Sequence, residues 1–244
     1  MLTKVKGIVI SKVNFNDNSV IAKIYTNVFG LQSYIVNGVK NNKGVVKQSH
    51  LLTLNLLELD VYHQQNKNLQ RIKEIKCFPL LINLHADMVK SSIAVFMSEL
   101  IYKSIKHENI PDENLFSFLY QSILYVENSK NTLSHFHLWF MLHYSSFLGF
   151  EPKPNFSDNK QYFSLIDGYF VEAEGLNTCR AETSKQIFNL ITVEAKNLHE
   201  LMFTENQRIK IYEALLKYFE LHEIALGTIN SYKILKQVFG KIWK

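Results

Sequence analysis

VKGIVISKVNFNDNSVIAKIYT, residues 5–26, decides the fold because it holds two stretches rich in Val and Ile on either side of a turn. VKGIVISKV (5–13) and SVIAKIYT (19–26) have the β-branched composition that is typical of strands. The connector NFNDN (14–18) supplies Asn and Asp, which favour turns. The segment therefore predicts two strands joined by a short connection.

Three further strands are predicted before Pro79. Gly30 precedes LQSYIVN (31–37), in which Leu31, Ile35 and Val36 are expected to point inward. The remaining two strands are LLTLNLLELDVYH (51–63) and, after the polar loop QQNKN, LQRIKEIKCF (69–78). Five strands in under 80 residues with short loops suit a small closed barrel such as an OB-fold, with an SH3-like barrel as the nearest competitor.

After Pro79 the apolar residues repeat at helical spacing. Helices are predicted at 82–108, 115–127 and 134–149, with Gly149 as a C-cap, and again from Thr183 onward. Residues 151–182 lose this period and predict an irregular segment with a small β-hairpin. The expected fold class is α+β, with an OB-fold-like barrel in residues 1–79, a helical bundle in residues 80–244 and a hairpin insertion at about 151–182.

The charge is distributed unevenly along the chain. Residues 1–79 contain 11 Lys and Arg against 4 Asp and Glu, or +7, whereas residues 80–244 contain 16 against 18, or −2. The segment NGVKNNKGVVKQSH (37–50) contains Lys40, Lys43 and Lys47 and no carboxylate. This pattern indicates that the barrel binds a polyanion, although charge alone does not separate nucleic acid from anionic lipid. For the loop itself, the alternative is an ordinary solvated surface turn.

No catalytic motif is present in the sequence. It has neither a glycine-rich phosphate loop nor a nucleophile elbow. His135, His137 and His143 are spaced by 2 and 8 residues, which does not place three metal ligands on one helix face. We therefore expect helix-packing or surface histidines, no catalytic residues, no cofactor and no metal site.

The cellular location is predicted from apolar runs and cysteines. The longest strictly apolar runs, such as IAVFM (93–97), fall far short of the roughly 20 residues that a membrane helix needs. Cys77 and Cys179 form no pair pattern, and free thiols indicate a reducing compartment. We expect a cytoplasmic protein with no membrane segment.

The order of several segments resembles the RecO family of bacterial recombination mediators. KGIVISKVNFNDNSVIAKIYTNVFGLQSYIVNGVKNNK resembles the family's opening strands and basic loop, and LLTLNLLELDVYH with NLQRIKEIK continues the match through the barrel. LFSFLYQSILYVE, HFHLWFMLHYSSFLGFEP and SYKILKQV resemble its helices. The resemblance covers nearly the whole chain, which makes it much more specific than any single motif.

One departure from the family pattern concerns zinc. Many RecO proteins carry four zinc-binding cysteines after the "LGF.P" segment, whereas EPKPNFSDNKQYFSLIDGYF contains none. The segment YFSLIDGYF still resembles the family's hairpin. We therefore expect the hairpin without the metal.

The resemblance implies a non-enzymatic protein of DNA repair and recombination in the DNA damage response. Such proteins bind single- and double-stranded DNA, anneal complementary strands, contact the acidic C-terminal tail of single-stranded-DNA-binding protein and, with RecR, help load RecA at gaps and double-strand breaks. The expected DNA-binding residues are cations of the barrel half: Lys6, Lys40, Lys43, Lys47, Arg71 and Lys73.

The expected contacts with the protein tail lie in the helical half. The aromatic-rich helices offer apolar material for a terminal phenylalanine, and its acidic neighbours need cations nearby. The candidates are Lys130, Lys153, Lys160 and Arg180. Two other functions remain open from the residues alone, namely an RNA-binding OB protein and a protein-interaction adaptor whose barrel is only a scaffold.

Overall fold

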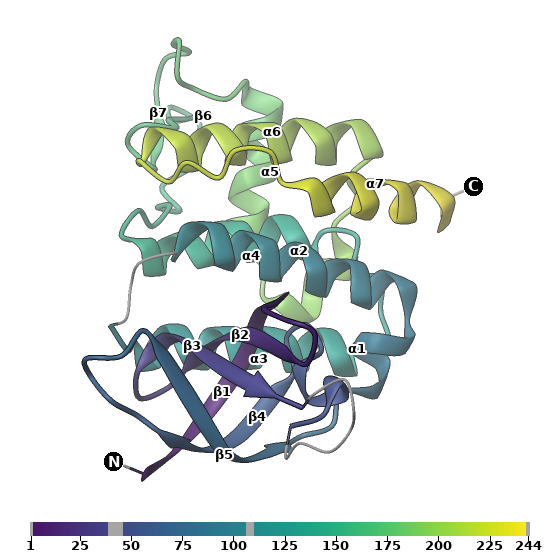
Figure 1. Cartoon of the computed structure of the whole chain (residues 1–244). Coiled ribbons are helices and arrows are strands. Elements are labelled where there is room, and N and C mark those ends of the chain that lie inside the picture. The colour runs from purple at the N-terminus through teal and green to yellow at the C-terminus, as the bar shows by residue number, and fades with distance from the viewer. Residues whose placement is uncertain (1, 39–45, 106–109, 243–244) are drawn as a thin grey trace. The chain divides into compact units, whose positions relative to one another are not determined.

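The computed structural model describes residues 2–38, 46–105 and 110–242, and the chain divides into two compact units (Figure 1). The first unit is Met1–Asn128 and the second is Ser129–Lys244. A closed barrel is followed by helices and a small two-stranded sheet, which confirms the predicted fold class. The predicted division after residue 79 falls inside the first unit, and a separate domain at 1–79 stays a prediction.

Five strands form the barrel in the order β1-β2-β3-β5-β4, and β1 pairs with both β2 and β4. This closed five-stranded arrangement is that of an OB-fold. The β3 and β5 strands run parallel, whereas the other neighbours are antiparallel. The strands are β1 Leu2–Asn14, β2 Ser19–Thr26, β3 Gly30–Asn37, β4 Leu56–Tyr62 and β5 Leu69–Cys77.

The barrel core follows from alternation along the strands. Inward positions of β2, β3 and β4 are apolar and buried: Val20, Ala22, Ile24, Tyr34, Val36, Leu57, Leu59 and Val61. Ile35, which was predicted to point inward, is only half-buried, because Tyr34 and Val36 on either side of it take the inward positions. Gly7 sits where a Cβ atom would lie 2.6 Å from the Ile24 side chain, so β1 needs glycine there to approach β2 closely.

The strand predicted at residues 51–63 starts later than expected. Residues Gln48–Leu51 form a short 3-10 helix, and β4 begins only at Leu56. Leu54 has a φ of 59°, and the Asn55 side chain donates hydrogen bonds to the carbonyls of Ser49 and His50. The leucine-rich composition favoured a strand, but this local turn ends the extended conformation.

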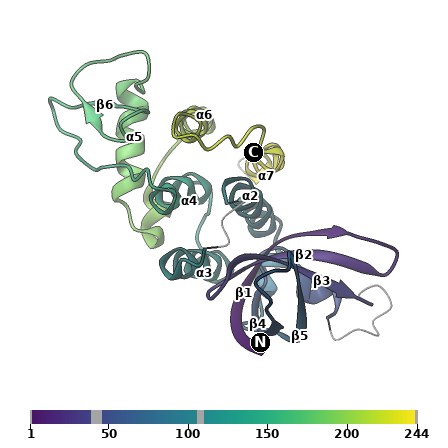
Figure 2. The ribbon, with the colours of Figure 1, turned by 60° about the vertical axis from the view of Figure 1, so that its left-hand side comes forward.

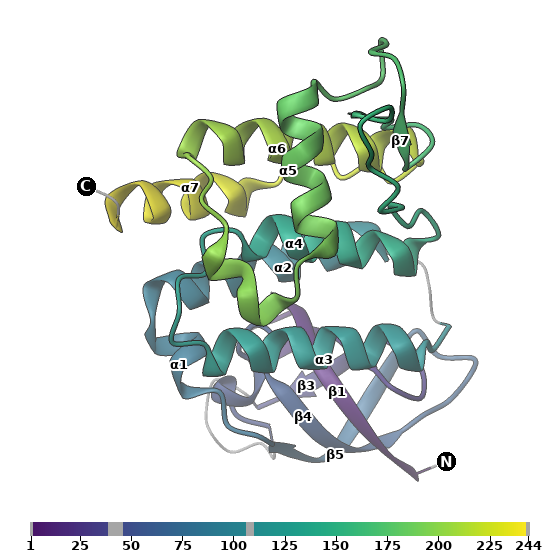
Figure 3. The ribbon, with the colours of Figure 1, turned by 180° about the vertical axis from the view of Figure 1, so that it is seen from behind.

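The α-helices in the described part of the first unit are α1 Ile82–Ala86, α2 Met88–Ser104 and α3 Glu113–Asn128. The single helix predicted at 82–108 is therefore interrupted, because Asp87 is extended and its carboxylate accepts hydrogen bonds from the amides of Val89 and Lys90. Helix α3 runs along one side of the barrel (Figure 3), where Phe116 stacks on Tyr25 with ring centroids 6.4 Å apart.

Glu127 of α3 fixes the segment that leaves the barrel. Its buried carboxylate accepts hydrogen bonds from the backbone amides of Ile82, Asn83 and Leu84, at 3.1, 3.1 and 2.6 Å. A carboxylate at a helix N-terminus satisfies amides that lack helical partners. This interaction therefore holds α1 against α3.

The second unit is helical with one small hairpin. Figure 2 shows α4, α6 and α7 nearly end-on, whereas α5 runs across the view. Gly149 ends the segment after α4 with a φ of 92°, as predicted for a C-cap. The elements are α4 Phe136–Ser145, β6 Tyr162–Phe163, β7 Phe170–Val171, α5 Ala181–Thr192, α6 Glu205–Leu221 and α7 Asn230–Ile242.

A pair of histidines is buried in this second unit. His135 and His137 are 4% and 1% exposed, and Arg208 lies near both. Burial lowers the pKa of His135 to about 4, and burial, with His135 and Arg208 contributing, lowers the pKa of His137 to about 3. Both imidazoles are therefore neutral at neutral pH and serve as packing residues.

These histidines predict that the second unit loses stability in acid. Because their folded pKa values lie below the unfolded value of about 6.5, protons bind the unfolded chain better. Their contribution is fully present above about pH 6.5 and is lost as the pH falls toward 4. Replacing His137 with Leu should reduce the pH slope of the free energy of unfolding by up to about 1.4 kcal/mol per pH unit, measured by denaturant titration at several pH values.

The matched control is His199→Leu, because His199 is exposed in the same unit. This control should keep the wild-type slope. A His137→Leu variant with an unchanged slope would contradict the assignment of acid sensitivity to the buried pair.

Candidate nucleic-acid interface

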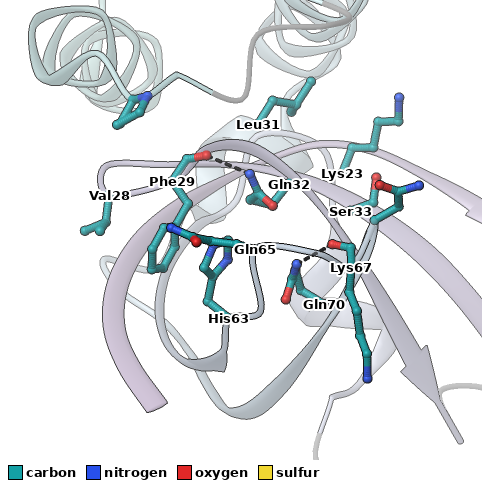
Figure 4. Close-up of a pocket in the computed structure, with 12 residues that line it drawn as sticks. Lys23, Val28, Phe29, Leu31, Gln32, Ser33, His63, Gln65, Lys67 and Gln70 are labelled. Carbon is teal, nitrogen blue, oxygen red and sulfur yellow. Dashed lines mark hydrogen bonds between the residues drawn. The ribbon is translucent and has the colours of Figure 1, made fainter. Parts of the chain in front are cut away.

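The barrel carries a groove between β2, β3 and the β4–β5 connection, residues 63–68. One cavity of this groove has a volume of about 500 Å³, and Figure 4 shows the side chains around it. OB-folds usually bind oligonucleotides on the face of their second and third strands and on the loop between the last two strands. The groove therefore lies where this fold places its ligands. Its lining residues are Lys23, Val28, Phe29, Leu31, Gln32, Ser33, His63, Gln65, Lys67, Asn68, Gln70 and Pro111.

A second cavity of about 830 Å³ adjoins the first. The two share Val28, Phe29, His63, Gln65 and Lys67, and the second extends to Thr3. Together they form one continuous hollow, which we call the β2–β3 groove. Because the groove extends over two adjoining cavities, it suits an extended ligand.

The groove is positively charged. Lys23 and Lys67 extend from it in different directions (Figure 4), and no lining residue in the described part of the chain is acidic. The Lys23 ammonium lies 4.8 Å from the ring centroid of Tyr102, a cation–π contact that positions it without neutralising its charge. Two cations beside neutral polar side chains suit the phosphates of a nucleic-acid strand.

Gln70 holds the β4–β5 connection in shape. This buried side chain accepts a hydrogen bond from the Gln64 amide at 2.9 Å, and it donates to the carbonyls of Gln64 at 2.9 Å and Lys67 at 2.6 Å. Figure 4 shows the bond to Lys67. One carboxamide thereby fixes both ends of the loop that carries Lys67, so this wall of the groove is ordered before any ligand binds.

The predicted DNA-binding residues fall into two groups, and in the first of them Arg71 lies near the β2–β3 groove. Arg71 of β5 is exposed and pairs with Ile35 of β3, and both residues line a small cavity. Ile35 lies two residues along β3 from Ser33, which lines the groove. Lys47 is exposed just before the 3-10 helix. Lys40 and Lys43 lie outside the described residues.

The second group lies on a face of mixed charge. Glu58 of β4 lies between two lysines, because it pairs with Lys6 of β1 on one side and with Lys76 of β5 on the other. Two residues further along β4, Asp60 pairs with Lys4 of β1 and with Glu74 of β5. Three lysines thus face three carboxylates across β1, β4 and β5. Lys73 is likewise paired, with its ammonium 3.8 Å from Glu74. Lys6 and Lys73 are therefore weaker candidates for phosphate than the cations of the groove.

The predicted protein-contacting residues are exposed in the second unit. Lys130 precedes α4, Lys160 belongs to the segment before β6, and Arg180 is the N-cap of α5. Lys153 forms an ion pair with Glu151. The structure does not gather these four cations into one cavity within the described residues, and their role stays a prediction.

Four residues of the groove were missed in the sequence: Lys23, Phe29, His63 and Lys67. Lys67 was visible as the cation of the predicted polar loop QQNKN, at a position that OB-folds use for binding. Phe29 and His63 carry no local signal, because they meet only when the barrel closes. Tyr25 and Tyr34 of the barrel are buried, so neither ring is open to a base.

Neither a metal centre nor a membrane helix emerges from the described ranges. They contain no group of three His, Cys, Asp or Glu side chains placed to hold a metal ion. No helix among them has the length and apolar character to cross a bilayer.

Comparison with known proteins identifies the family. The family description "Recombination protein O N terminal" matches residues 1–79, and "Recombination protein O C terminal" matches residues 85–223. The chain belongs to the RecO family. The "DNA repair protein RecO" of Azobacteroides pseudotrichonymphae is 35% identical, and that of Phocaeicola vulgatus is 30% identical, each over 98% of this chain and 100% of the relative. A general role in DNA repair follows for this RecO family member.

In this RecO family protein, the three hydrogen bonds by which Gln70 clamps the β4–β5 loop lead to a testable prediction. Replacing Gln70 with Leu removes three hydrogen bonds and puts an apolar side chain in place of the carboxamide. The free energy of unfolding should fall by about 1–3 kcal/mol, and the Gln64 amide should exchange its hydrogen faster. Gln65→Ala is the matched control, because Gln65 is exposed in the same loop and should leave Gln64 exchange unchanged. Unchanged exchange in the Gln70→Leu variant would contradict the clamp.

Proposed function

We propose that this protein is a non-enzymatic, DNA-binding recombination mediator that acts in gap and double-strand-break repair. It binds single- and double-stranded DNA, anneals complementary strands, and works in the cytoplasm at the nucleoid. It contacts the tail of single-stranded-DNA-binding protein and, with RecR, helps load RecA. Family membership supports the repair role, and the finer steps come from the RecO resemblance.

The observation that carries the proposal is the charge of the β2–β3 groove. Lys23 and Lys67 lie in a hollow whose described lining has no carboxylate, whereas the face around Lys6 balances three lysines with three acids. A phosphate backbone gains from uncompensated cations and gains little where each cation already faces a carboxylate. Strand annealing needs such sequence-independent backbone contacts, because they leave base edges free to pair.

The salt dependence of DNA binding tests this proposal. In the double variant Lys23→Gln, Lys67→Gln, two phosphate contacts are lost. The slope of log K against log salt for single-stranded DNA should flatten by roughly 1.4, about 0.7 for each contact. Fluorescence anisotropy with a labelled oligonucleotide measures this slope, and circular dichroism verifies that the variant is folded.

The matched control replaces Lys4 and Lys76 with Gln on the mixed-charge face, and it should keep the wild-type slope. A triple variant of Lys40, Lys43 and Lys47 to Ala tests the basic loop in the same assay and should flatten the slope by roughly 2. An unaltered slope in the groove variant, or a larger change in the control, would contradict the assignment of phosphate contacts to Lys23 and Lys67. Preferential competition by structured RNA would favour the RNA-binding alternative, and no binding at any salt would favour the adaptor.

The partner proposal makes a separate prediction for the second unit. A peptide copying the acidic, phenylalanine-ending tail should bind in the micromolar range and more weakly at high salt, because acids pair with exposed cations. Removing its last phenylalanine should cost a large part of the affinity, since an apolar socket is then empty. Equal binding of both peptides, or of neither, would refute the docking role of the helical unit. Single Ala variants of Lys130, Lys153, Lys160 and Arg180 then identify the contacting cations.

A further inference from the structure

Two aromatic rings stand face to face in the β2–β3 groove. The Phe29 and His63 ring centroids are 3.8 Å apart, and their planes differ by 8°. Figure 4 shows the rings side by side beneath the Gln65 side chain. Both rings line both cavities, so the pair stands where the two cavities meet.

Backbone hydrogen bonds and core packing hold Phe29 in place. The Phe29 amide donates to the Thr26 hydroxyl at 2.9 Å, and the Phe29 carbonyl accepts from the Gln32 side chain at 2.7 Å. Phe29 also packs against the barrel core. Burial lowers the pKa of His63, so its ring is uncharged at neutral pH. The result is a fixed flat surface rather than a mobile side chain.

The surroundings define the chemistry that this surface can take. A flat aromatic ligand gains by stacking on it, and Ser33, Gln65 and Asn68 supply hydrogen-bond donors and acceptors for polar ring edges. Lys23 and Lys67 supply positive charge for an attached anion. An aromatic ring with polar edges that is joined to phosphates is a nucleotide.

An unpaired nucleotide fits better than a paired one. In a duplex each base face is covered by its neighbours in the stack, so it cannot lie against a protein ring without unstacking. In a single strand the base is free to stack on an aromatic side chain, whatever its sequence.

We propose that the Phe29–His63 pair is a stacking platform for one unpaired base, which makes the β2–β3 groove prefer single-stranded DNA to duplex DNA. This inference rests on the proposed DNA-binding function. It assigns to the two lysines the backbone contacts and to the two rings the discrimination between unpaired and paired strands.

The test crosses protein variants with DNA ligands. The full-length wild type and the Phe29→Leu variant are titrated with three labelled ligands of equal length: a single strand, the same strand with all bases removed, and a duplex. The wild type should bind the intact strand about tenfold more tightly than the abasic strand, as one stacked base would give. In Phe29→Leu this ratio should fall close to one, while duplex affinity stays unchanged.

Further variants separate stacking from folding. Phe29→Tyr keeps an aromatic ring and should restore the wild-type ratio. Phe78→Leu removes an exposed ring that is not among the described lining residues of the groove, and should change nothing. If Phe29→Leu fails to fold, His63→Leu takes its place. Fluorescence of 2-aminopurine placed in the strand gives a direct readout, since stacking on the platform quenches it.

The outcomes distinguish failure of the stacking platform from failure of the proposed DNA-binding function. An unchanged ratio in Phe29→Leu, or an equal loss for all three ligands, would overturn the platform while DNA binding by the groove stands. Failure of the wild type to bind any of the three ligands would refute the proposed function itself.

Discussion

The parallel pairing of β3 with β5 is the constraint on which the groove depends. Only three residue pairs join these strands, from Ser33 and Leu69 to Ile35 and Arg71, yet they close the barrel. Gln70 lies in the middle of this short pairing, opposite Tyr34, and the same side chain fixes the β4–β5 loop. Barrel closure and loop geometry are therefore one event, and closure brings His63 and Lys67 to Phe29 and Lys23.

Closure also separates charge on the barrel surface. The antiparallel registers of β1, β4 and β5 place Lys4 and Lys6 opposite Asp60 and Glu58, which leaves that face nearly neutral. The net charge of the barrel half is therefore carried elsewhere, and the groove is a hollow in which two cations face no acid among the described lining residues. A net charge of +7 says that a polyanion is attracted, whereas strand register decides which face receives it.

The sequence predicted the barrel, the helices and the hairpin because alternation, helical period and turn residues are local signals. It misplaced the start of β4, because the Asn55 side chain bonds stop the strand in a leucine-rich run that otherwise looks extended. The sequence predicted DNA contacts for both Lys6 and Arg71. In the structure Lys6 pairs with Glu58, whereas Arg71 lies near the groove. Phe29, His63 and the clamp by Gln70 could not be predicted, since their contacts join segments that are distant in the chain.

Photo-crosslinking of a single strand containing 5-iodouracil, followed by mass spectrometry of the linked peptides, tests the central claim most directly. The β2–β3 groove as the nucleic-acid interface predicts crosslinks to the turn around Phe29 and to the β4–β5 loop around Lys67. These crosslinks should disappear in excess unlabelled single strand. Crosslinks confined to the mixed-charge face of β1, β4 and β5, or to the helical unit, would contradict this account of the protein.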